Sequence, residues 1–444
     1  MQFNQLGISK SLLRAIKQSG YTQPTSIQIK SIPAVLTGKD VMAAAQTGTG
    51  KTAGFTLPLL QILNSNHRPL PNKPRALILT PTRELAAQVE ESIRTYGINE
   101  PLNSTVVFGG VNIRPQIKKL KSGADILVAT PGRLLDLHRE KAVNFSEIKI
   151  LILDEADRML DMGFIHDVRK IIGKLPAQRQ NLMFSATFSK DVRALAKTIC
   201  HNPIEIDATP PNSTVETILQ SHYQVSQKDK TTLLIKLLKK TNDQVLVFSR
   251  TKHGADRICK ALNRENIDAV SIHGNKSQHQ RTSSLEGFKK YKHQVMVATD
   301  IAARGIDIDQ LPLVINFDIP HVPEDYVHRI GRTGRAGASG KALSFVSDDE
   351  TKQLASIERL IKQKIHLNKE DQIEREHVPQ KPKEDQVHGK HVPQKPKELK
   401  QHGAEFSSGN KGMNPKHFRS RRPKFSAPKQ KGNNLGRARH GNPS

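Results

Sequence analysis

The sequence predicts an α/β protein with two tandem, doubly wound parallel-sheet domains and a disordered, basic C-terminal tail. Three observations carry this prediction. Short apolar segments rich in β-branched residues alternate with helical patterns through most of the chain. The Pro-rich segment 207–214 interrupts that alternation and divides the strands into two groups. Residues 406–444 contain ten Lys or Arg side chains and no acid, a composition that cannot bury enough apolar surface to fold.

The first domain is expected to span residues 1–207. Its strands are near-continuous apolar runs, which are typical of parallel sheets covered by helices on both faces. In chain order we expect strands at 41–45, 76–80, 105–110, 125–130, 150–157 and 182–187.

The second domain is expected to span residues 217–368, after a linker at 208–216. Its strands are expected at 245–249, 269–274, 295–300, 313–318 and 342–346. Ligands of doubly wound sheets bind at the carboxyl ends of the strands. The strings that follow several of these strands are therefore the candidate sites: TPTRE, TPGR, DEAD, SAT and TDIAARGID.

The tail, residues 369–444, is expected to be disordered. Residues 369–405 carry no net charge and repeat the string HVPQKPKE, and residues 406–444 carry ten positive charges and three phenylalanines. Two interpretations stay open for this segment. It is either a solvated solubility tail or a non-specific RNA-binding arm, and the absence of acid after residue 405 favours the arm.

The charge balance indicates a polyanionic partner. The chain has 69 Lys+Arg against 42 Asp+Glu, a net charge of +27, which favours nucleic acid or an anionic membrane. Two cysteines are too few for a disulfide framework or a multi-cysteine zinc site. No apolar run is long enough to span a bilayer, and no secretory signal pattern is present. These features predict a cytoplasmic protein.

The string AQTGTGKT, residues 45–52, has the chemistry of a phosphate-binding loop. It follows an expected strand and precedes an expected helix, and it departs from the general P-loop pattern only in having Ala45 for the first glycine. Glycines let backbone N–H groups face phosphate oxygens, Lys51 can reach the β- and γ-phosphates, and the Thr52 hydroxyl can bind Mg²⁺. The expected nucleotide contacts are Ala45, Gln46, Thr47, Gly48, Thr49, Gly50, Lys51 and Thr52.

Two acids follow the strand expected at 150–153. Asp154 is the better candidate for Mg²⁺, which keeps several waters and needs few protein oxygens. Glu155 is the better candidate for orienting or deprotonating the attacking water.

The string D-E-A-D at 154–157, together with AQTGTGKT, resembles the DEAD-box RNA helicases of helicase superfamily 2. The resemblance covers residues 1–350 and is greatest to the bacterial RhlE-like branch. It implies two RecA-like domains, ATP and Mg²⁺ as cofactors, and RNA as the partner, as single strand and short duplex, without a DNA preference. Ribosomal and RNA-decay proteins are further candidate partners, and no membrane partner is implied.

The string GYTQPTSIQ, residues 20–28, resembles the Q motif of this family. The resemblance implies that Gln28 reads the adenine, since a glutamine amide can pair with adenine N6 and N7. It also places Tyr21 and the upstream aromatic Phe3 at the nucleotide. The alternative interpretation of Phe3, made without the motif, is a residue of the hydrophobic core.

Other strings resemble the family's RNA-contact motifs. The resemblance assigns RNA contacts to hydroxyls, a glycine amide and guanidiniums in both domains, a donor set that suits phosphate. These residues are Thr82, Arg83, Gly110, Thr130, Arg133, Ser249, Arg281 and Thr299. Each T-P string is also a plain helix start, with Thr as the cap.

The resemblance also implies a coupling between ATP and RNA. Ser185 and Thr187 of SAT are expected to bond the DEAD carboxylates, including Asp157, and His328 is expected to face them from the second domain. Gly305 and Asp307 would meet the ribose, and Arg332 and Arg335 would act as arginine fingers on the γ-phosphate.

Two functions are compatible with these motifs. The first is an ATP-dependent RNA helicase that unwinds short duplexes or remodels ribonucleoproteins. The second is an ATP-gated RNA clamp or annealing chaperone with little processive unwinding.

Overall fold

The computed structural model describes residues 1–45, 48–64, 69–208, 218–303, 306, 308, 310–334 and 340–368. The expected tail at 369–444 and nearly all of the expected linker lie outside these residues. Within the described part of the chain, no helix is long and apolar enough to cross a membrane.

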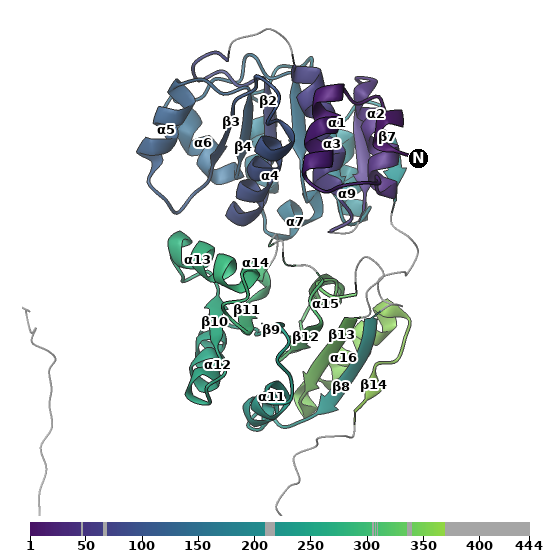
Figure 1. The fold of residues 1–444 in the computed structure, drawn as a ribbon, viewed down its shortest axis with the longest axis vertical. Helices are drawn as coiled ribbons and strands as arrows, with labels where there is room; N and C mark the ends of the chain where they lie inside the picture. The colour runs from purple at the N-terminus through teal and green to yellow at the C-terminus, as the bar shows by residue number, and fades with distance from the viewer. Residues whose placement is uncertain are drawn as a thin grey trace, which may run out of the picture. The chain divides into compact units, whose positions relative to one another are not determined.

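Residues 1–208 form the first lobe, built on a seven-stranded sheet in the order β3-β4-β2-β5-β6-β1-β7 (Figure 1). All its strand pairs are parallel. The strands are β1 (Val41–Ala44), β2 (Ala76–Leu79), β3 (Ser104–Val107), β4 (Ile126–Ala129), β5 (Ile150–Leu153), β6 (Gln180–Ser185) and β7 (Ile204–Asp207). The helices are η1 (Phe3–Gln5), α1 (Lys10–Gln18), α2 (Ser26–Leu36), α3 (Lys51–Leu63), α4 (Arg83–Tyr96), α5 (Ile113–Lys121), α6 (Pro131–Arg139), α7 (Ala156–Asp161), α8 (Ile165–Ile172) and α9 (Lys190–Ile199).

Residues 218–368 form the second lobe, on a second seven-stranded parallel sheet in the order β10-β11-β9-β12-β13-β8-β14. The strands are β8 (Ile218–Gln224), β9 (Val245–Phe248), β10 (Ala269–Ile272), β11 (Val295–Ala298), β12 (Leu313–Asn316), β13 (Gly340–Val346) and β14 (His366–Leu367). The helices are α11 (Lys230–Leu238), α12 (Lys252–Arg264), α13 (Gln278–Lys289), α14 (Asp300–Ala303), α15 (Pro323–Ile330), η2 (Asp348–Glu350) and α16 (Thr351–Ile361).

The two sheets have the same strand order. Adding seven to each strand number of the first sheet gives the order of the second, so β1 corresponds to β8 and β5 to β12. This correspondence lets equivalent loops of the two lobes be compared directly. The fold class of two doubly wound parallel sheets is confirmed.

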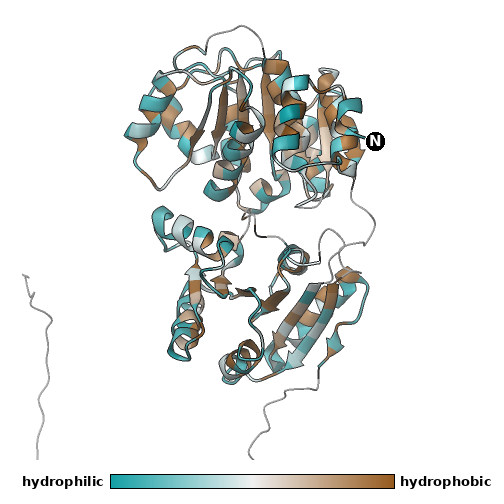
Figure 2. Cartoon of the chain, viewed as in Figure 1, coloured by the Kyte–Doolittle hydropathy of each residue, from teal (hydrophilic) through white to brown (hydrophobic). Residues whose placement is uncertain are grey.

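Both sheets are buried on both faces, as their apolar strands predict. In the first sheet, alternate strand residues such as Val41 and Ala43 pack with α1–α4, while Met42 packs with α5–α9 in a separate core. In the second sheet, Val245 and Val247 pack with α11 and α12. The hydropathy colouring shows the same arrangement, with apolar strands beneath helices whose outer faces are polar (Figure 2).

Three strands were not expected from the sequence: β7, β8 and β14. β7 and β14 are the last strands at one edge of each sheet, and β8 is next to β14. Only Ile206 of β7 is buried, and β14 is exposed throughout. Their sequences therefore lack the continuous apolar runs by which the inner strands were recognised.

Candidate functional site

The phosphate-loop candidate lies between β1 and α3, at the carboxyl edge of the first sheet. Gly48 and Gly50 have φ angles of 79° and 90°, which side-chain-bearing residues rarely adopt. Lys51 is the first residue of α3 and is buried, yet its Nζ has no hydrogen-bond partner among the described residues. A buried ammonium without a partner is costly, and an anion at this helix start would remove that cost.

The second lobe has a matching lysine whose charge is already neutralised. Lys230 is the first residue of α11, which follows β8 as α3 follows β1. It is fully buried, with its Nζ 2.5 Å from Glu350 and 3.8 Å from Asp318. The position that is open to a phosphate at Lys51 is therefore occupied by carboxylates at Lys230. This contrast supports a nucleotide site in the first lobe.

The two acids follow β5, beside the phosphate-loop candidate. Asp154 and Glu155 are both almost completely buried. Burial raises the pKa of Asp154 to about 7, partly opposed by the charge of Lys51. A carboxylate that is destabilised in this way is stabilised strongly by a cation placed against it, so the residues present fit a Mg²⁺ ion.

Glu155 has a strained backbone and an ion-pair partner. Its φ and ψ are 53° and 55°, in the left-handed region, where it precedes α7. Its Oε2 lies 3.3 Å from Nε of Arg158, one turn along that helix, and both side chains are buried. Strained residues of this kind cluster at active sites and switch regions, so Glu155 is a candidate functional residue.

Gln28 is bonded to the phosphate-loop candidate. Its Oε1 accepts from the Thr25 N–H at 3.0 Å, and its Nε2 donates to the carbonyl of Gly50 at 3.1 Å. Gly50 has a φ of 90°, and a Cβ there would also displace that Nε2, so glycine is favoured at this position. Both ends of the Gln28 amide are therefore engaged, and pairing with an adenine requires these bonds to be exchanged.

The two aromatic residues expected at the nucleotide lie in different environments. Phe3 is buried in the core of the first lobe, as the simpler interpretation predicts. Tyr21 is 53% exposed, with its ring 6.3 Å from that of Tyr96. Their contacts with a nucleotide stay predictions.

The SAT and DEAD strings are in contact. The backbone N–H of Asp157 donates to the Ser185 hydroxyl at 3.3 Å, and the N–H of Ala186 donates to the Asp157 carboxylate at 3.0 Å. The carboxylate is thus bonded by a backbone amide where the sequence predicted a Ser185 or Thr187 hydroxyl. SAT and DEAD are therefore in contact, as expected, but the bond to the Asp157 carboxylate comes from the Ala186 backbone amide.

The RNA candidates Thr82, Arg83 and Gly110 lie at the same edge of the first sheet. The Thr82 hydroxyl accepts from the Leu85 N–H and caps α4, so this helix begins two residues later than the T-P string at 80–81 suggests. Arg83 lies directly over Gly110, where a Cβ would come within 2.0 Å of the guanidinium. Gly110 has a φ of 75°, so its backbone conformation favours glycine, whereas the flexible Arg83 side chain could move aside.

Thr130 and Arg133 begin α6. Thr130 is the N-cap residue, but its side chain makes no capping bond. Arg133 donates to the carbonyl of Val111 at 2.9 Å, while its Nε and one other guanidinium nitrogen have no hydrogen-bond partner among the described residues. Both residues retain polar atoms that could contact phosphate.

Three RNA candidates come from the second lobe. Ser249 is buried and donates to Asp318 at 3.2 Å, and Thr299 immediately precedes α14. Arg281 forms an ion pair with Glu84 of α4 at 2.9 Å, and its neighbour Gln278 donates to Glu84 at 2.8 Å. Burial lowers the pKa of Arg281.

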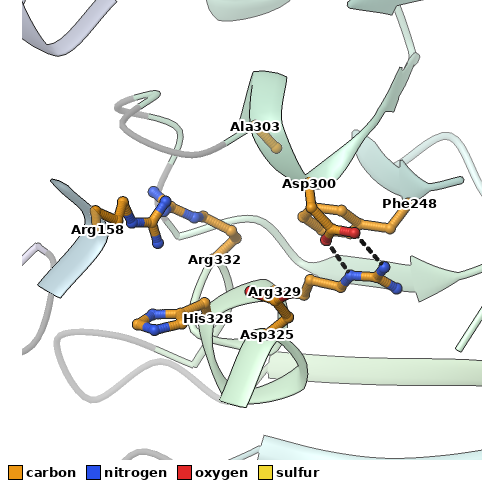
Figure 3. A pocket seen from close by; sticks show the side chains of 8 residues that line it. All are labelled: Arg158, Phe248, Asp300, Ala303, Asp325, His328, Arg329 and Arg332. Carbon is orange, nitrogen blue, oxygen red and sulfur yellow. Dashed lines mark hydrogen bonds and ion pairs between the residues drawn. The ribbon is translucent and has the colours of Figure 1, made fainter. Parts of the chain in front are cut away.

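Arg332 and His328 line a small hollow, together with Arg158 (Figure 3). Arg332 follows the end of α15, and it donates to the carbonyl of Ile306 at 2.7 Å. Beside it, Arg329 forms a two-point ion pair with Asp300 at 2.6 and 2.7 Å.

Five expected site residues lie outside the described residues. They are Gln46, Thr47, Gly305, Asp307 and Arg335. Their expected roles stay predictions.

Three residues were missed by sequence reasoning: Glu84, Arg158 and Arg329. Arg329 binds Asp300 and also donates to the Asp318 carbonyl at 2.6 Å, which ties together three segments of the second lobe. Glu84 is the last residue of the string TPTRE and Arg158 directly follows DEAD, but their partners can be identified only in three dimensions. Of the three, only Arg158 could have been found from the sequence, because residues three apart on a helix are neighbours and Arg158 is three residues from Glu155.

Two family models match the chain. Residues 25–195 match the DEAD/DEAH box helicase model, and residues 229–337 match the helicase conserved C-terminal domain. The DEAD-box ATP-dependent RNA helicase RhpA of Helicobacter pylori is 41% identical over 366 residues, which cover 82% of this chain and 73% of that protein. The DEAD-box ATP-dependent RNA helicase CshA of Geobacillus kaustophilus is 41% identical over 368 residues, which cover 83% and 78%.

A solved structure agrees with these sequence relatives. Dbp5 of S. cerevisiae, bound to RNA and ADP BeF3, matches with a TM-score of 0.74 and 32% identity, over 82% of this chain and 94% of that one. The chain belongs to the family of DEAD-box ATP-dependent RNA helicases. It is accordingly an ATP-hydrolysing enzyme, and the assignment to the RhlE-like branch stays a prediction.

Proposed function

We propose that this protein hydrolyses ATP in its first lobe and uses that hydrolysis to unwind short RNA duplexes locally or to remodel ribonucleoproteins. The observation that carries the proposal is the contrast between Lys51 and Lys230. The Lys51 ammonium is buried and has no hydrogen-bond partner in the part of the chain that the structure describes, whereas the Lys230 ammonium is neutralised by Glu350. The names of the relatives favour the helicase over the RNA clamp.

The ATP phosphates are proposed to bind at the start of α3. Lys51 would lie against the β- and γ-phosphates, and the backbone N–H groups around Gly48 and Gly50 would surround them. Thr52 and Asp154 would hold Mg²⁺, which would neutralise charge on the phosphate oxygens. Gln28 would exchange its bond to Gly50 for the adenine edge.

Glu155 is proposed to orient the attacking water and to accept its proton. Its carboxylate is buried beside Asp154, and Nε of Arg158 lies 3.3 Å from it in the first turn of α7. Arg332 and Arg335 would supply positive charge to the γ-phosphate from the second lobe. His328 and the Ser185–Asp157 contact would make this arrangement depend on bound RNA.

RNA is proposed to bind along the carboxyl edges of both sheets. Arg83 and Arg133 would contact phosphates from the first lobe, and Arg281 and Thr299 from the second. Arg281 would then exchange its ion pair with Glu84 for a phosphate. Contacts to 2′-hydroxyls would favour RNA over DNA. Two buried free cysteines are compatible with the cytoplasm as the compartment.

The test of this function is a strand-displacement assay on a short RNA duplex. We expect ATP hydrolysis to be stimulated by RNA more than by DNA of the same sequence. With ATP, one protein molecule should separate many duplexes, while a non-hydrolysable analogue should support at most one event per molecule. Equal yields with ATP and the analogue would favour the clamp, and stimulation by DNA alone would contradict the RNA assignment.

The tail is proposed to add RNA affinity without sequence preference. Deleting residues 369–444 removes ten net positive charges. We expect weaker RNA binding and a shallower dependence of affinity on salt, because fewer counterions are released. ATP hydrolysis without RNA should be unchanged. The measurement is RNA titration at several salt concentrations, and an unchanged salt slope would show that the segment serves solubility only.

A further inference from the structure

The turn between α13 and β11 presents one aromatic and three basic side chains to solvent. Lys289, Lys290, Tyr291 and Lys292 are consecutive, and all four are exposed. Tyr291 is 81% exposed, the highest fraction of any large hydrophobic side chain in the described residues. A ring this exposed contributes almost nothing to the apolar core, so folding does not explain it.

The backbone conformation of Tyr291 is strained, so folding stability does not explain the presence of this residue. Its φ is 58°, in the left-handed region. The Tyr291 N–H donates to the Phe288 carbonyl and the Lys292 N–H to the Gly287 carbonyl, at 3.0 and 2.9 Å. This is the helix-ending motif in which glycine is usual, because a side chain is strained there. The chain thus keeps an exposed tyrosine where glycine would be more stable.

Side-chain hydrogen bonds connect the turn to neighbouring segments of the second lobe. Gln244 donates to the carbonyls of Phe288 and His293 at 2.6 and 3.2 Å, and Gln294 donates to the Thr241 carbonyl at 2.7 Å. The His293 ring lies against Gly287 and pairs with Asp268 at 3.1 Å. The backbone that carries the exposed Tyr291 ring is therefore already ordered. It loses little conformational entropy when a ligand binds to the ring.

The turn lies at the opposite edge of the second sheet from the RNA candidates. It precedes β11, whereas Thr299 follows that strand. Helix α13 connects Gln278 at the carboxyl edge to Lys289 at the turn, and its 12 residues span about 18 Å. The turn cannot make the same contacts as the proposed RNA site.

We infer that the Lys289–Lys292 turn is a second binding site for single-stranded RNA. A base stacks on the Tyr291 ring, and the three lysines attract the flanking phosphates. Aromatic platforms within basic surfaces bind single strands without sequence preference. An acidic protein segment would use the lysines but would not need an exposed ring, so RNA fits this surface better. The inference goes beyond the proposed function and rests on it only in assuming that the protein binds RNA.

The first experiment compares Tyr291→Gly and Tyr291→Phe in the full chain. Binding is measured by fluorescence anisotropy with RNAs of about 6 and about 30 nucleotides, since only the longer one can reach beyond the main site. Tyr291→Gly is expected to weaken binding of the long RNA roughly fivefold to tenfold through the lost stacking. Tyr291→Phe should bind both RNAs like the wild type, and neither variant should change binding of the short one.

Tyr291→Gly also distinguishes an effect on RNA binding from an effect on folding stability. Because glycine relieves the left-handed strain, the denaturation midpoint of Tyr291→Gly should stay equal or rise, while its affinity for long RNA falls. Lys362→Gly is the matched control. Lys362 is also exposed, with a φ of 54° at the end of α16. This control relieves the same strain and removes a charge, yet it should leave the affinity for long RNA unchanged.

A second variant tests the lysines. Changing Lys289, Lys290 and Lys292 to glutamine should lower the slope of log affinity against log salt by about 2 for long RNA. Unchanged affinity for long RNA in both this variant and Tyr291→Gly overturns the inference. Loss of poly-glutamate binding in the lysine variant with unchanged RNA binding also overturns it, in favour of an acidic protein. Failure of the proposed function has a different signature, since the wild type would then show no RNA-stimulated hydrolysis.

Discussion

Glu155→Gln is expected to lower RNA-stimulated ATP hydrolysis by about 10² to 10⁴-fold, the usual contribution of a positioned general base. Glutamine keeps the size and most of the polarity of the side chain but cannot accept the proton of the attacking water. Glu155 is buried and lies 3.3 Å from Arg158, so the amide can remain in place without rearrangement. ATP and RNA binding should therefore persist while turnover stops.

The measurement is phosphate release from ATP under saturating RNA, with nucleotide and RNA affinities determined separately. Glu91→Gln, an exposed position on α4, is the matched control and should hydrolyse ATP like the wild type. A second comparison uses Arg158→Met. If Glu155 served only as the ion-pair partner of Arg158, both variants would lose activity equally and both would be destabilised. Wild-type turnover by Glu155→Gln would show that another group acts as the base.

The part of the fold that sequence predicts well is its centre. The inner strands are buried on both faces and are therefore apolar throughout, so a short window of sequence identifies them. β8 is harder, because residues 219–222 are Leu-Gln-Ser-His and most of them are only half-buried. Its pairing with β13 depends on contacts more than a hundred residues away in sequence. Local pattern carries no information about such pairing.

The same distinction applies to the site. The phosphate-loop and DEAD residues act as contiguous strings, so their chemistry can be read from spacing alone. Glu84 was missed because its partner Arg281 is 197 residues further along the chain. Lys230 has no motif around it, and only the matching strand order of the two sheets shows that it occupies the position of Lys51. Contacts between distant segments require the fold before they can be assigned.

Arg332→Lys is expected to lower the rate of ATP hydrolysis by roughly 10³-fold, within the range known for arginine fingers. Lysine keeps the positive charge but loses the planar pair of donors that bridges two oxygens of a phosphate. Arg332 is buried and donates to the Ile306 carbonyl, and lysine retains one donor for that carbonyl. The fold of the second lobe should therefore survive the change.

The loss should fall on the rate constant at saturation and not on ATP affinity, because the residues proposed to hold the phosphates, Mg²⁺ and the adenine in the ground state, Lys51, Thr52 and Gln28, belong to the first lobe. Single-turnover hydrolysis and nucleotide binding separate these two quantities. Arg359→Lys, an exposed position on α16, is the control and should behave like the wild type. If Arg332→Lys instead weakened ATP binding with an unchanged rate, the guanidinium would act in the ground state. The second lobe would then hold the phosphates as well as the ribose, although its own matching lysine, Lys230, is already neutralised by Glu350.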